Sequence, residues 1–176
     1  MGRPVDETAS RTVRAAADGD VRAFSRLVAL LHAPMMRVAY VIAGDPEIAQ
    51  DAVQAAWTIA WRRLGSVRSA DRIEPWLVSV AANEARQLVR HQRRRPVVEI
   101  PAEMPDLTGD PGAAIDQLDL ARSLRGLSPD DRTLLALRFV AGLDSGEIAH
   151  HLGLSASGVR SRLARLLERL RQELER

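Results

Sequence analysis

The segment that begins at Asp144 constrains the fold most strongly, because it predicts two helices joined by a tight turn. It reads DSGEIAHHLGLSASGVRSRLARLLERLRQELER. Asp144 can cap the first helix, with Glu147 three residues later as its reciprocal partner. Gly153 can end that helix, and Ser155 is a good N-cap for the second one. The spacing therefore predicts a helical hairpin at the C-terminal end of the sequence.

The second of these helices is expected to have one apolar side and one polar side. Its apolar stripe recurs at helical spacing and consists of Val159, Leu163, Leu166, Leu170 and Leu174. The residues that point away from the stripe are small or basic, namely Ser157, Arg160, Ser161, Ala164 and Arg165. Arginines and hydroxyls presented on a second helix are typical of a DNA-reading helix-turn-helix. An ordinary hairpin with a solvated arginine face is the alternative.

Composition favours an all-α protein of two small helical domains. Hydrophobic residues make up 46% of the 176 residues, aromatic residues only 3%, and no strand-like alternation of β-branched residues occurs. The chain has no cysteine, which excludes disulfides and thiolate metal sites. The histidines show no metal-ligand spacing, and no phosphate-binding loop or paired carboxylates occur. We therefore expect no metal, no cofactor and no enzyme activity.

Charge divides the chain into alternating blocks. All 25 basic residues are arginine, and two blocks of them, residues 86–95 and 160–171, each hold five. Between these blocks, the segment PVVEIPAEMPDLTGDPG (residues 96–112) carries four prolines and four acids, so that it reads as an extended acidic linker. We expect a flexible tail over 1–18, a helical domain over 19–95 and a second one over 113–176. No apolar run approaches a membrane span and no signal peptide is evident, so a cytoplasmic protein without membrane insertion is predicted.

Helix signals divide the N-terminal domain further. Asp20 can cap a helix to about residue 32, and Pro34 is expected to restart the chain into a second helix to residue 43. Asp45 can cap a long helix over 46–64, with Pro46 in its first turn. A polar loop over 64–74 and a helix over 75–92 follow. In the C-terminal domain, helices are expected over 111–126 and after Ser128, the latter with Leu134, Leu135, Leu137 and Phe139 in the core.

Two polar strips fall outside the predicted core of the N-terminal domain. The helix over 46–64 leaves Asp51, Gln54 and Arg62 outside its buried side. The helix over 75–92 can carry Asn83, Arg86, Gln87 and Arg90 on one outward strip. An asparagine can read a base edge and arginines can hold phosphates, although a structural amide is an equal reading of Asn83.

Three segments in this order resemble the extracytoplasmic-function (ECF) group of the sigma-70 family. They are DPEIAQDAVQAAWTIAWRRL, PWLVSVAANEARQLVRHQRRR and LSPDDRTLLALRFVAGLDSGEIAHHLGLSASGVRSRLARLLERLR, on either side of the acidic linker. The resemblance implies a bacterial alternative sigma factor that binds core RNA polymerase and directs promoter recognition, promoter melting and transcription initiation. It implies that the linker follows the RNA path of the polymerase, and an inert tether is the alternative.

The resemblance also implies partners and their residues. The polymerase contacts are its largest-subunit clamp helices and flap, the other partner is promoter DNA, and an anti-sigma factor is a further candidate. Core polymerase is expected at Asp51, Gln54, Thr58 and Arg62. The −10 element is expected at Val67, Arg68, Ser69, Asn83, Arg86, Gln87 and Arg90. The −35 element is expected at Ser157, Arg160, Ser161, Arg162, Ala164 and Arg165.

Two other classes of protein fit the same helices. One is a stand-alone helix-turn-helix transcriptional regulator whose N-terminal domain senses a ligand or dimerises. The other is a helical interaction module without DNA function. Dependence on polymerase distinguishes the three classes. A sigma factor binds core polymerase and opens a promoter, a regulator binds duplex operator DNA without polymerase, and an interaction module binds neither polymerase nor DNA.

Overall fold

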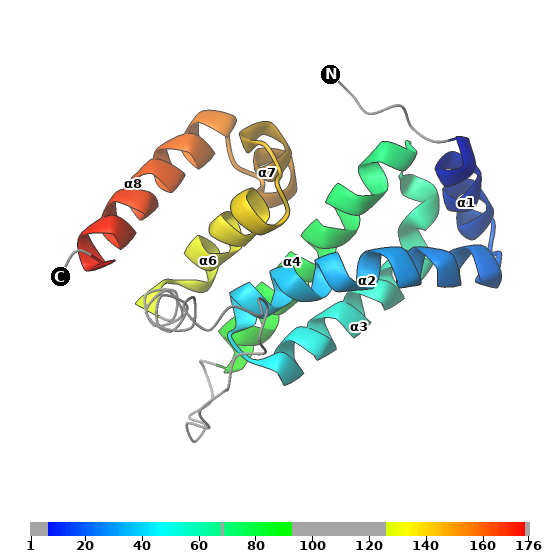
Figure 1. Ribbon diagram of the computed structural model, residues 1–176, viewed down its shortest axis with the longest axis horizontal. Helices are drawn as coiled ribbons and strands as arrows, with labels where there is room; N and C mark the ends of the chain where they lie inside the picture. The colour runs from blue at the N-terminus through cyan, green and yellow to red at the C-terminus, as the bar shows by residue number, and fades with distance from the viewer. Residues whose placement is uncertain (1–6, 68, 93–125, 175–176) are drawn as a thin grey trace, which may run out of the picture.

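The chain forms an all-α fold, as its composition predicted. The computed structural model describes residues 7–67, 69–92 and 126–174, and every regular element among them is a helix (Figure 1). The N-terminal domain contains α1 (Glu7–Ala17), α2 (Val21–Ala43), α3 (Pro46–Arg63), the short 3-10 turns η1 (Leu64–Ser66) and η2 (Ala70–Arg72), and α4 (Ile73–Gln92). The C-terminal domain contains α6 (Pro129–Leu135), the π-helical turn η3 (Ala136–Val140), α7 (Ser145–Leu152) and α8 (Ala156–Leu174).

Helices α2, α3 and α4 pack against one another and enclose the core of the N-terminal domain. Met35, Ile42 and Leu77 are fully buried at its centre. The buried face of α3 consists almost entirely of small side chains, namely Ala49, Ala52, Val53, Ala56 and Ala60. Small residues let the helix axes approach closely, so that α3 can present its other face to solvent without loss of core packing.

The predicted caps of the N-terminal domain are confirmed. The Asp20 carboxylate accepts from the backbone N–H groups of Arg22 and Ala23, and the Asp45 carboxylate accepts from those of Glu47 and Ile48. Pro46 occupies the first turn of α3, where its missing N–H costs nothing. These local signals fix where α2 and α3 begin.

Helix α2 runs without interruption through Pro34, so the predicted break at this proline is wrong. A proline removes one helical hydrogen bond but does not end a helix whose packing continues on both sides. Ala23 and Leu27 before Pro34 and Met35 and Val38 after it are all buried. Tertiary packing along one face therefore outweighs the local cost of the proline.

The same helix corrects the expectation that no segment approaches a membrane span. By length and composition alone, Val21–Ala43 could cross a membrane, with a mean hydropathy of 1.4 over an 18-residue window. Its apolar side chains instead pack against α1, α3 and α4 within this domain. Seven residues of α2 are buried, whereas Val21 and Leu30 are exposed, so one face of the helix belongs to the core.

Residues 7–17 form α1, which corrects the expected flexible tail over 1–18 for that part of the chain. Val13 and Ala16 of α1 are buried, and α1 packs on α2 and on the 64–72 segment. Its apolar residues recur at helical spacing on one face, so the sequence did carry a signal for this helix, although the segment is short and polar on average. The contact with α2 supplies the stability that the isolated segment lacks.

The C-terminal domain begins with the predicted cap. The Ser128 hydroxyl accepts from the Asp131 N–H, and Pro129 starts α6. Leu134, Leu135 and Leu137 are buried as predicted. Phe139 was expected in the same core but is 59% exposed. Phe139 lies in the π-helical turn η3, close to its end at Val140, where the side chain is open to solvent.

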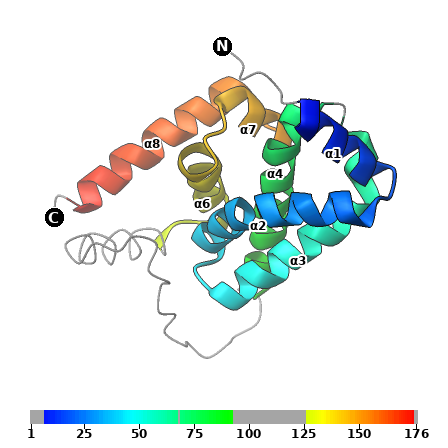
Figure 2. The ribbon, with the colours of Figure 1, turned by 45° about the vertical axis from the view of Figure 1, so that its right-hand side comes forward.

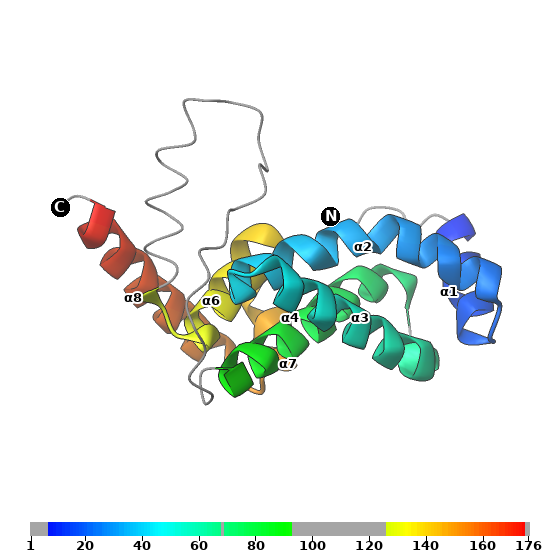
Figure 3. The same ribbon diagram turned by 90° about the horizontal axis from the view of Figure 1, so that it is seen from below.

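The two domains pack against each other along α4. Helix α6 contacts α2 and α4, η3 contacts the same two helices, and α7 contacts α4. In all views α6 lies between α8 and the α2–α4 pair, with α1 at the far end of the molecule (Figures 2 and 3). The buried side chains of both domains form one continuous cluster. The sequence predicted two domains but not this contact between them.

Several predicted features lie outside the described residues. They are the acidic linker (96–112), most of the predicted helix over 111–126, Arg68, the arginines at 93–95 and the side chain of Leu174. The division into domains at 95/96 and 112/113 therefore stays a prediction.

Candidate nucleic-acid and polymerase interfaces

Helices α7 and α8 form the predicted helix-turn-helix. The Asp144 carboxylate accepts from the N–H groups of Gly146 at 2.7 Å and Glu147 at 2.9 Å, and the Glu147 carboxylate accepts from the Asp144 N–H at 2.9 Å. This is the predicted capping box. Gly153 ends α7 in the left-handed conformation, with φ of 66°, and the Ser155 hydroxyl accepts from the Gly158 N–H. Val159 is fully buried and anchors α8.

The outward face of α8 is open to solvent. Ser157, Arg160, Ser161, Ala164 and Arg165 are all exposed. Arg160 forms no hydrogen bond or ion pair with any residue in the described ranges, and Arg165 donates from Nε to the Ser161 carbonyl at 3.3 Å. Both guanidinium groups therefore keep most of their donors for a ligand. Burial and the neighbouring His150 lower the pKa of His151 on α7 below its usual value.

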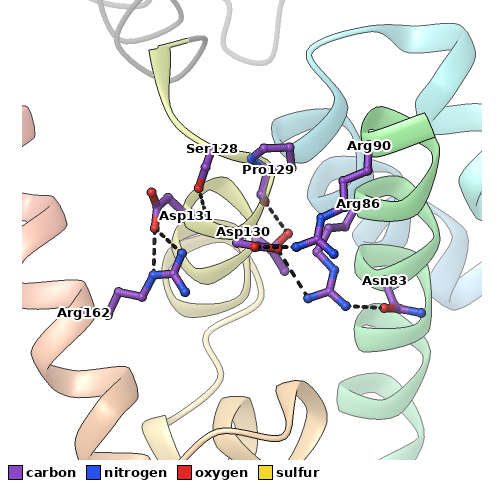
Figure 4. A network of polar contacts seen from close by, with 9 residues as sticks. Asn83, Arg86, Arg90, Ser128, Pro129, Asp130, Asp131 and Arg162 are labelled. Atoms are coloured by element: carbon purple, nitrogen blue, oxygen red, sulfur yellow. Dashed lines mark hydrogen bonds and ion pairs between the residues drawn. The ribbon is translucent and has the colours of Figure 1, made fainter. Parts of the chain in front are cut away.

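Arg162 differs from the other predicted α8 residues because it is already engaged. Its Nε and Nη2 both contact Asp131 Oδ1 at 2.8 Å, which ties α8 to α6 (Figure 4). Asp131 is only 14% exposed, so the pair is partly shielded from water. This geometry gives Arg162 an acidic partner within the chain, and its expected contact with the −35 element stays a prediction.

The α4 strip is present but only partly open. Gln87 and Arg90 are exposed, whereas Asn83 and Arg86 are half-buried. Arg86 Nη2 donates to Asn83 Oδ1 at 2.9 Å, and Gln87 donates to Glu84 at 3.3 Å. The Asn83 amide therefore orients the Arg86 guanidinium while its nitrogen stays available. Positioning and base reading are compatible roles for one amide.

Asp130 of α6 lies against this strip and was missed at the level of sequence. Its carboxylate contacts Arg90 Nη2 at 2.5 Å and Arg86 Nη1 at 3.5 Å (Figure 4). The two partners are separated from Asp130 by about forty residues of sequence. No local pattern reports a contact at such a separation. Only the docking of α6 on α4 reveals that two candidate phosphate-binding arginines face an acid of the other domain.

The loop before α4 is organised rather than extended. The residues expected to form a polar loop over 64–74 contain η1 and η2, and α4 begins at Ile73. Val67 was expected to contact the −10 element, but its side chain is partly buried. Ser69 is exposed. Ser69 donates to the Asp71 carboxylate, and this bond lowers the pKa of Asp71. Asn83 lies ten residues beyond Ile73, about 15 Å along α4, so loop and strip are separate surfaces.

The candidate polymerase-binding residues line the exposed face of α3. Asp51, Gln54, Thr58 and Arg62 are all exposed. At 3.6 residues per turn they fall within a sector of about 80°, directly opposite the buried alanine face. Trp61 borders this strip, is 46% exposed and packs edge-to-face on Phe24 with ring centroids 4.9 Å apart. An exposed tryptophan held rigidly by a second ring is a good anchor for a protein partner.

The pKa of Asp144 yields a testable pH dependence. The N–H groups of Glu147 and Gly146 donate to its carboxylate and hold its pKa below the usual value for aspartate. A depressed folded-state pKa contributes stability above the unfolded-state pKa, and this stability is lost as pH falls through the folded-state value. Asp144→Asn keeps a cap but removes the charge. We therefore expect the difference in melting temperature between wild type and variant to grow from pH 3 to pH 5 and then level off. A pH-independent difference would contradict the assignment.

No group of three or more His, Cys, Asp or Glu side chains with metal-binding geometry occurs in the described ranges. The surfaces described above carry guanidinium donors on α4 and α8 and a mixed polar strip with a tryptophan on α3.

Comparison with known proteins agrees with this arrangement. Residues 27–95 match the model of sigma-70 region 2, and residues 117–170 match that of sigma-70 region 4. The chain is 34% identical to the RNA polymerase sigma factor CarQ of Myxococcus xanthus over 165 residues, which cover 89% of this chain and 92% of CarQ. It is 30% identical to the probable RNA polymerase sigma factor RfaY of Xanthomonas campestris, but spans only 42% of that longer protein.

A solved structure has the same fold. The structure of CnrH in complex with the cytosolic domain of CnrY superposes with a TM-score of 0.69 at 27% identity, covering 95% of this chain and 97% of that one. CnrH is named as an RNA polymerase sigma factor of Cupriavidus metallidurans.

The chain therefore belongs to the sigma-70 family of RNA polymerase sigma factors, in the ECF group. It is an alternative sigma factor that directs transcription initiation, and the stand-alone regulator is not favoured. Sigma factors are not themselves catalysts, which agrees with the expectation of a non-enzyme at the level of the family.

Proposed function

We propose that three surfaces of this chain bind three different partners during transcription initiation. The α3 strip binds core polymerase, the α4 strip binds the −10 element and the outward face of α8 binds the −35 element. The observation that carries the proposal is the placement of polar strips opposite buried faces on three separate helices. The α3 and α8 strips are open to solvent, and the α4 strip is partly covered by α6 through Asp130.

For core polymerase we assign Asp51, Gln54, Thr58 and Arg62. Asp51 and Arg62 form no ion pair with any residue in the described part of the chain, so both charges are available. Trp61 extends this surface as an apolar anchor. The partners proposed on the polymerase are the clamp helices of the largest subunit for α3 and the flap for the C-terminal domain.

For the −10 element we assign Asn83, Arg86, Gln87 and Arg90, with Ser69 and Val67 in the loop. Arginines 86 and 90 would hold phosphates, and the Asn83 amide nitrogen would face a base. For the −35 element we assign Ser157, Arg160, Ser161, Ala164 and Arg165. Arg162 is left out because its guanidinium holds Asp131.

We assign no cofactor, a cytoplasmic location and no insertion into the membrane. A protein antagonist such as an anti-sigma factor is a further partner, supported by the relative CnrH, which was solved with the cytosolic domain of CnrY bound.

Run-off transcription tests the proposal as a whole. Purified chain is added to core polymerase on a library of promoter fragments, and the transcripts are sequenced. We expect transcripts that depend on both the chain and core polymerase and that share two upstream elements. Specific binding to duplex DNA without core enzyme, together with no transcription, would contradict it.

A change at Asn83 separates promoter melting from polymerase binding. Asn83→Ala removes the acceptor of the Arg86 hydrogen bond and the amide nitrogen. We expect severalfold lower permanganate reactivity of −10 thymines at saturating holoenzyme, with core affinity unchanged. Full reactivity in the variant would assign Asn83 a structural role only.

A further inference from the structure

Helix α8 is tied to α6 by a partly buried ion pair. Both Nε and Nη2 of Arg162 contact Asp131 Oδ1 at 2.8 Å (Figure 4). The Asp131 side chain is 14% exposed and the Arg162 side chain 37%. Two donors of a rigid planar group that meet one oxygen define a direction as well as a distance. The pair can therefore fix how α8 is oriented relative to α6.

Helix α6 gives the Asp131 carboxylate a fixed position. The Asp131 N–H donates to the Ser128 hydroxyl at 3.1 Å, which holds the first turn of the helix. Pro129 before Asp131 and Thr133 and Leu134 after it are all buried. The Thr133 hydroxyl in turn donates to the Pro129 carbonyl at 2.7 Å. Because α6 cannot turn without exposing these side chains, Asp131 is a stable reference point for α8.

The apolar contacts of α8 determine its inward side more firmly than its rotation. Val159 is fully buried, whereas Leu163 and Leu166 further along the helix keep a small exposed fraction. Apolar contact is non-directional, so a modest rotation about Val159 replaces some of these contacts with others. Arg162 lies three residues after Val159 and three before Arg165, about 60° around the helix from each. Its contact with α6 therefore limits how far the outward face can turn.

We infer that Asp131 is a positioning residue for reading of the −35 element, and that it acts through Arg162 on the rotation of α8. The inference rests on the proposed role of the outward face of α8. Directed contacts form only when a binding face is held within about 10–20° of its productive geometry. A partly buried ion pair suits this role, because desolvation offsets much of its attraction while its geometry stays specific. Asp131 would thus affect base discrimination without touching DNA.

Truncation of this acid should separate discrimination from affinity. Asp131→Ala removes the acceptor, frees the Arg162 guanidinium and removes one negative charge. Holoenzyme is titrated on a promoter from the run-off library and on the same promoter with its −35 element replaced, and the ratio of the two affinities measures discrimination. We expect this ratio to fall about fivefold, the lower end of the cost of one mismatched base pair. Affinity for the replaced element should not fall, since the freed guanidinium can attract phosphate.

Glu173→Ala is the matched control. It frees Arg169 of the same helix from an ion pair at 3.9 Å and removes one negative charge in the same way. That pair lies within α8 and does not connect it to α6. The discrimination ratio of this variant should equal that of wild type. An equal fall in both variants would show that charge near the DNA, and not the orientation of α8, sets discrimination, and would overturn the inference.

Arg162→Lys tests the same contact with both charges kept. An ammonium group attracts phosphate, but it cannot present two fixed donors to one carboxylate oxygen. We expect a loss of discrimination similar to that of Asp131→Ala. The double variant should lose no more than either single variant, because both changes break one contact. Losses that add would show that the two residues act independently, as they would if Arg162 contacted the −35 element itself, and would also overturn the inference.

Folding and the wild-type ratio keep the outcomes distinct. Each variant is first compared with wild type by circular dichroism and melting temperature, and Arg162→Lys carries the test if Asp131→Ala melts below the assay temperature. If wild-type holoenzyme transcribes but shows no discrimination at the −35 element, the assignment of α8 fails and the inference fails with it. If wild type discriminates and the folded variants keep the full ratio, α8 remains the reading helix and the inference alone fails.

Discussion

The double variant Asp51→Arg with Gln54→Ala is expected to weaken binding to core RNA polymerase by at least about tenfold, about 1.4 kcal/mol. Both side chains lie on the exposed face of α3, and neither contributes to the buried alanine face. The first change reverses a charge that has no intramolecular partner in the described part of the chain. The second removes a hydrogen-bonding amide.

The physical reason for a large effect is that interfaces concentrate their energy in few residues. Like charges placed against each other at a desolvated interface cost far more than a lost rim contact. The α3 strip is narrow, and Trp61 lies at its border. Promoter-directed transcription should fall together with core affinity.

The control variant is Asp18→Arg with Gln92→Ala. It makes the same two kinds of change at exposed positions outside α3 and outside the proposed DNA-binding residues. Both double variants should retain the helical circular dichroism and melting temperature of wild type, since neither touches the core. Core affinity is measured by titration of a fluorescent chain with core enzyme. Wild-type affinity in the folded α3 variant, or an equal loss in the control, would show that α3 is not the docking surface.

Local signals explain why most helix boundaries could be predicted from sequence. Asp20, Asp45, Ser128 and Asp144 each cap the helix that follows, and each cap depends only on residues two or three positions away. The apolar stripe of α8 is equally local, and Val159, Leu163, Leu166 and Leu170 are all buried as predicted. The helix-turn-helix is the clearest case, because caps, turn and periodicity all agree.

The sequence predictions that were wrong or missing share one cause, which is contact between segments that are distant in the sequence. Pro34 signals a break, yet packing along α2 overrides it, and α1 is stabilised by a helix that it contacts only in the folded chain. Phe139 was expected in the core, but it is exposed in the π-helical turn η3. The pairing of Asp130 with Arg86 and Arg90 depends on the docking of two domains. Residue identity could suggest which arginines bind DNA, but not that an acid already covers two of them.

Arg165→Ala is expected to weaken recognition of the −35 element by about 1–3 kcal/mol and to relax the base preference there. Arg165 is exposed on α8, and its only recorded contact within the described ranges is a long bond from Nε to the Ser161 carbonyl. Its two terminal nitrogens are therefore free to take a guanine edge as a bidentate pair. Because a bidentate pair discriminates between bases, its loss changes specificity as well as affinity.

Arg169→Ala provides the matched comparison, since it removes the same side chain one turn later on the same helix. Arg169 forms a loose, exposed ion pair with Glu173 at 3.9 Å and lies beside the predicted reading face rather than on it. Its loss should lower affinity evenly across promoter sequences through reduced attraction to phosphates. Holoenzyme is titrated on promoters that carry each base at each −35 position, and the spread of affinities is compared between variants. If only Arg165→Ala reduces the differences in affinity between these promoters, Arg165 reads a base. Equal losses of affinity for both variants, independent of sequence, would instead show that the Arg165 guanidinium contacts the DNA backbone.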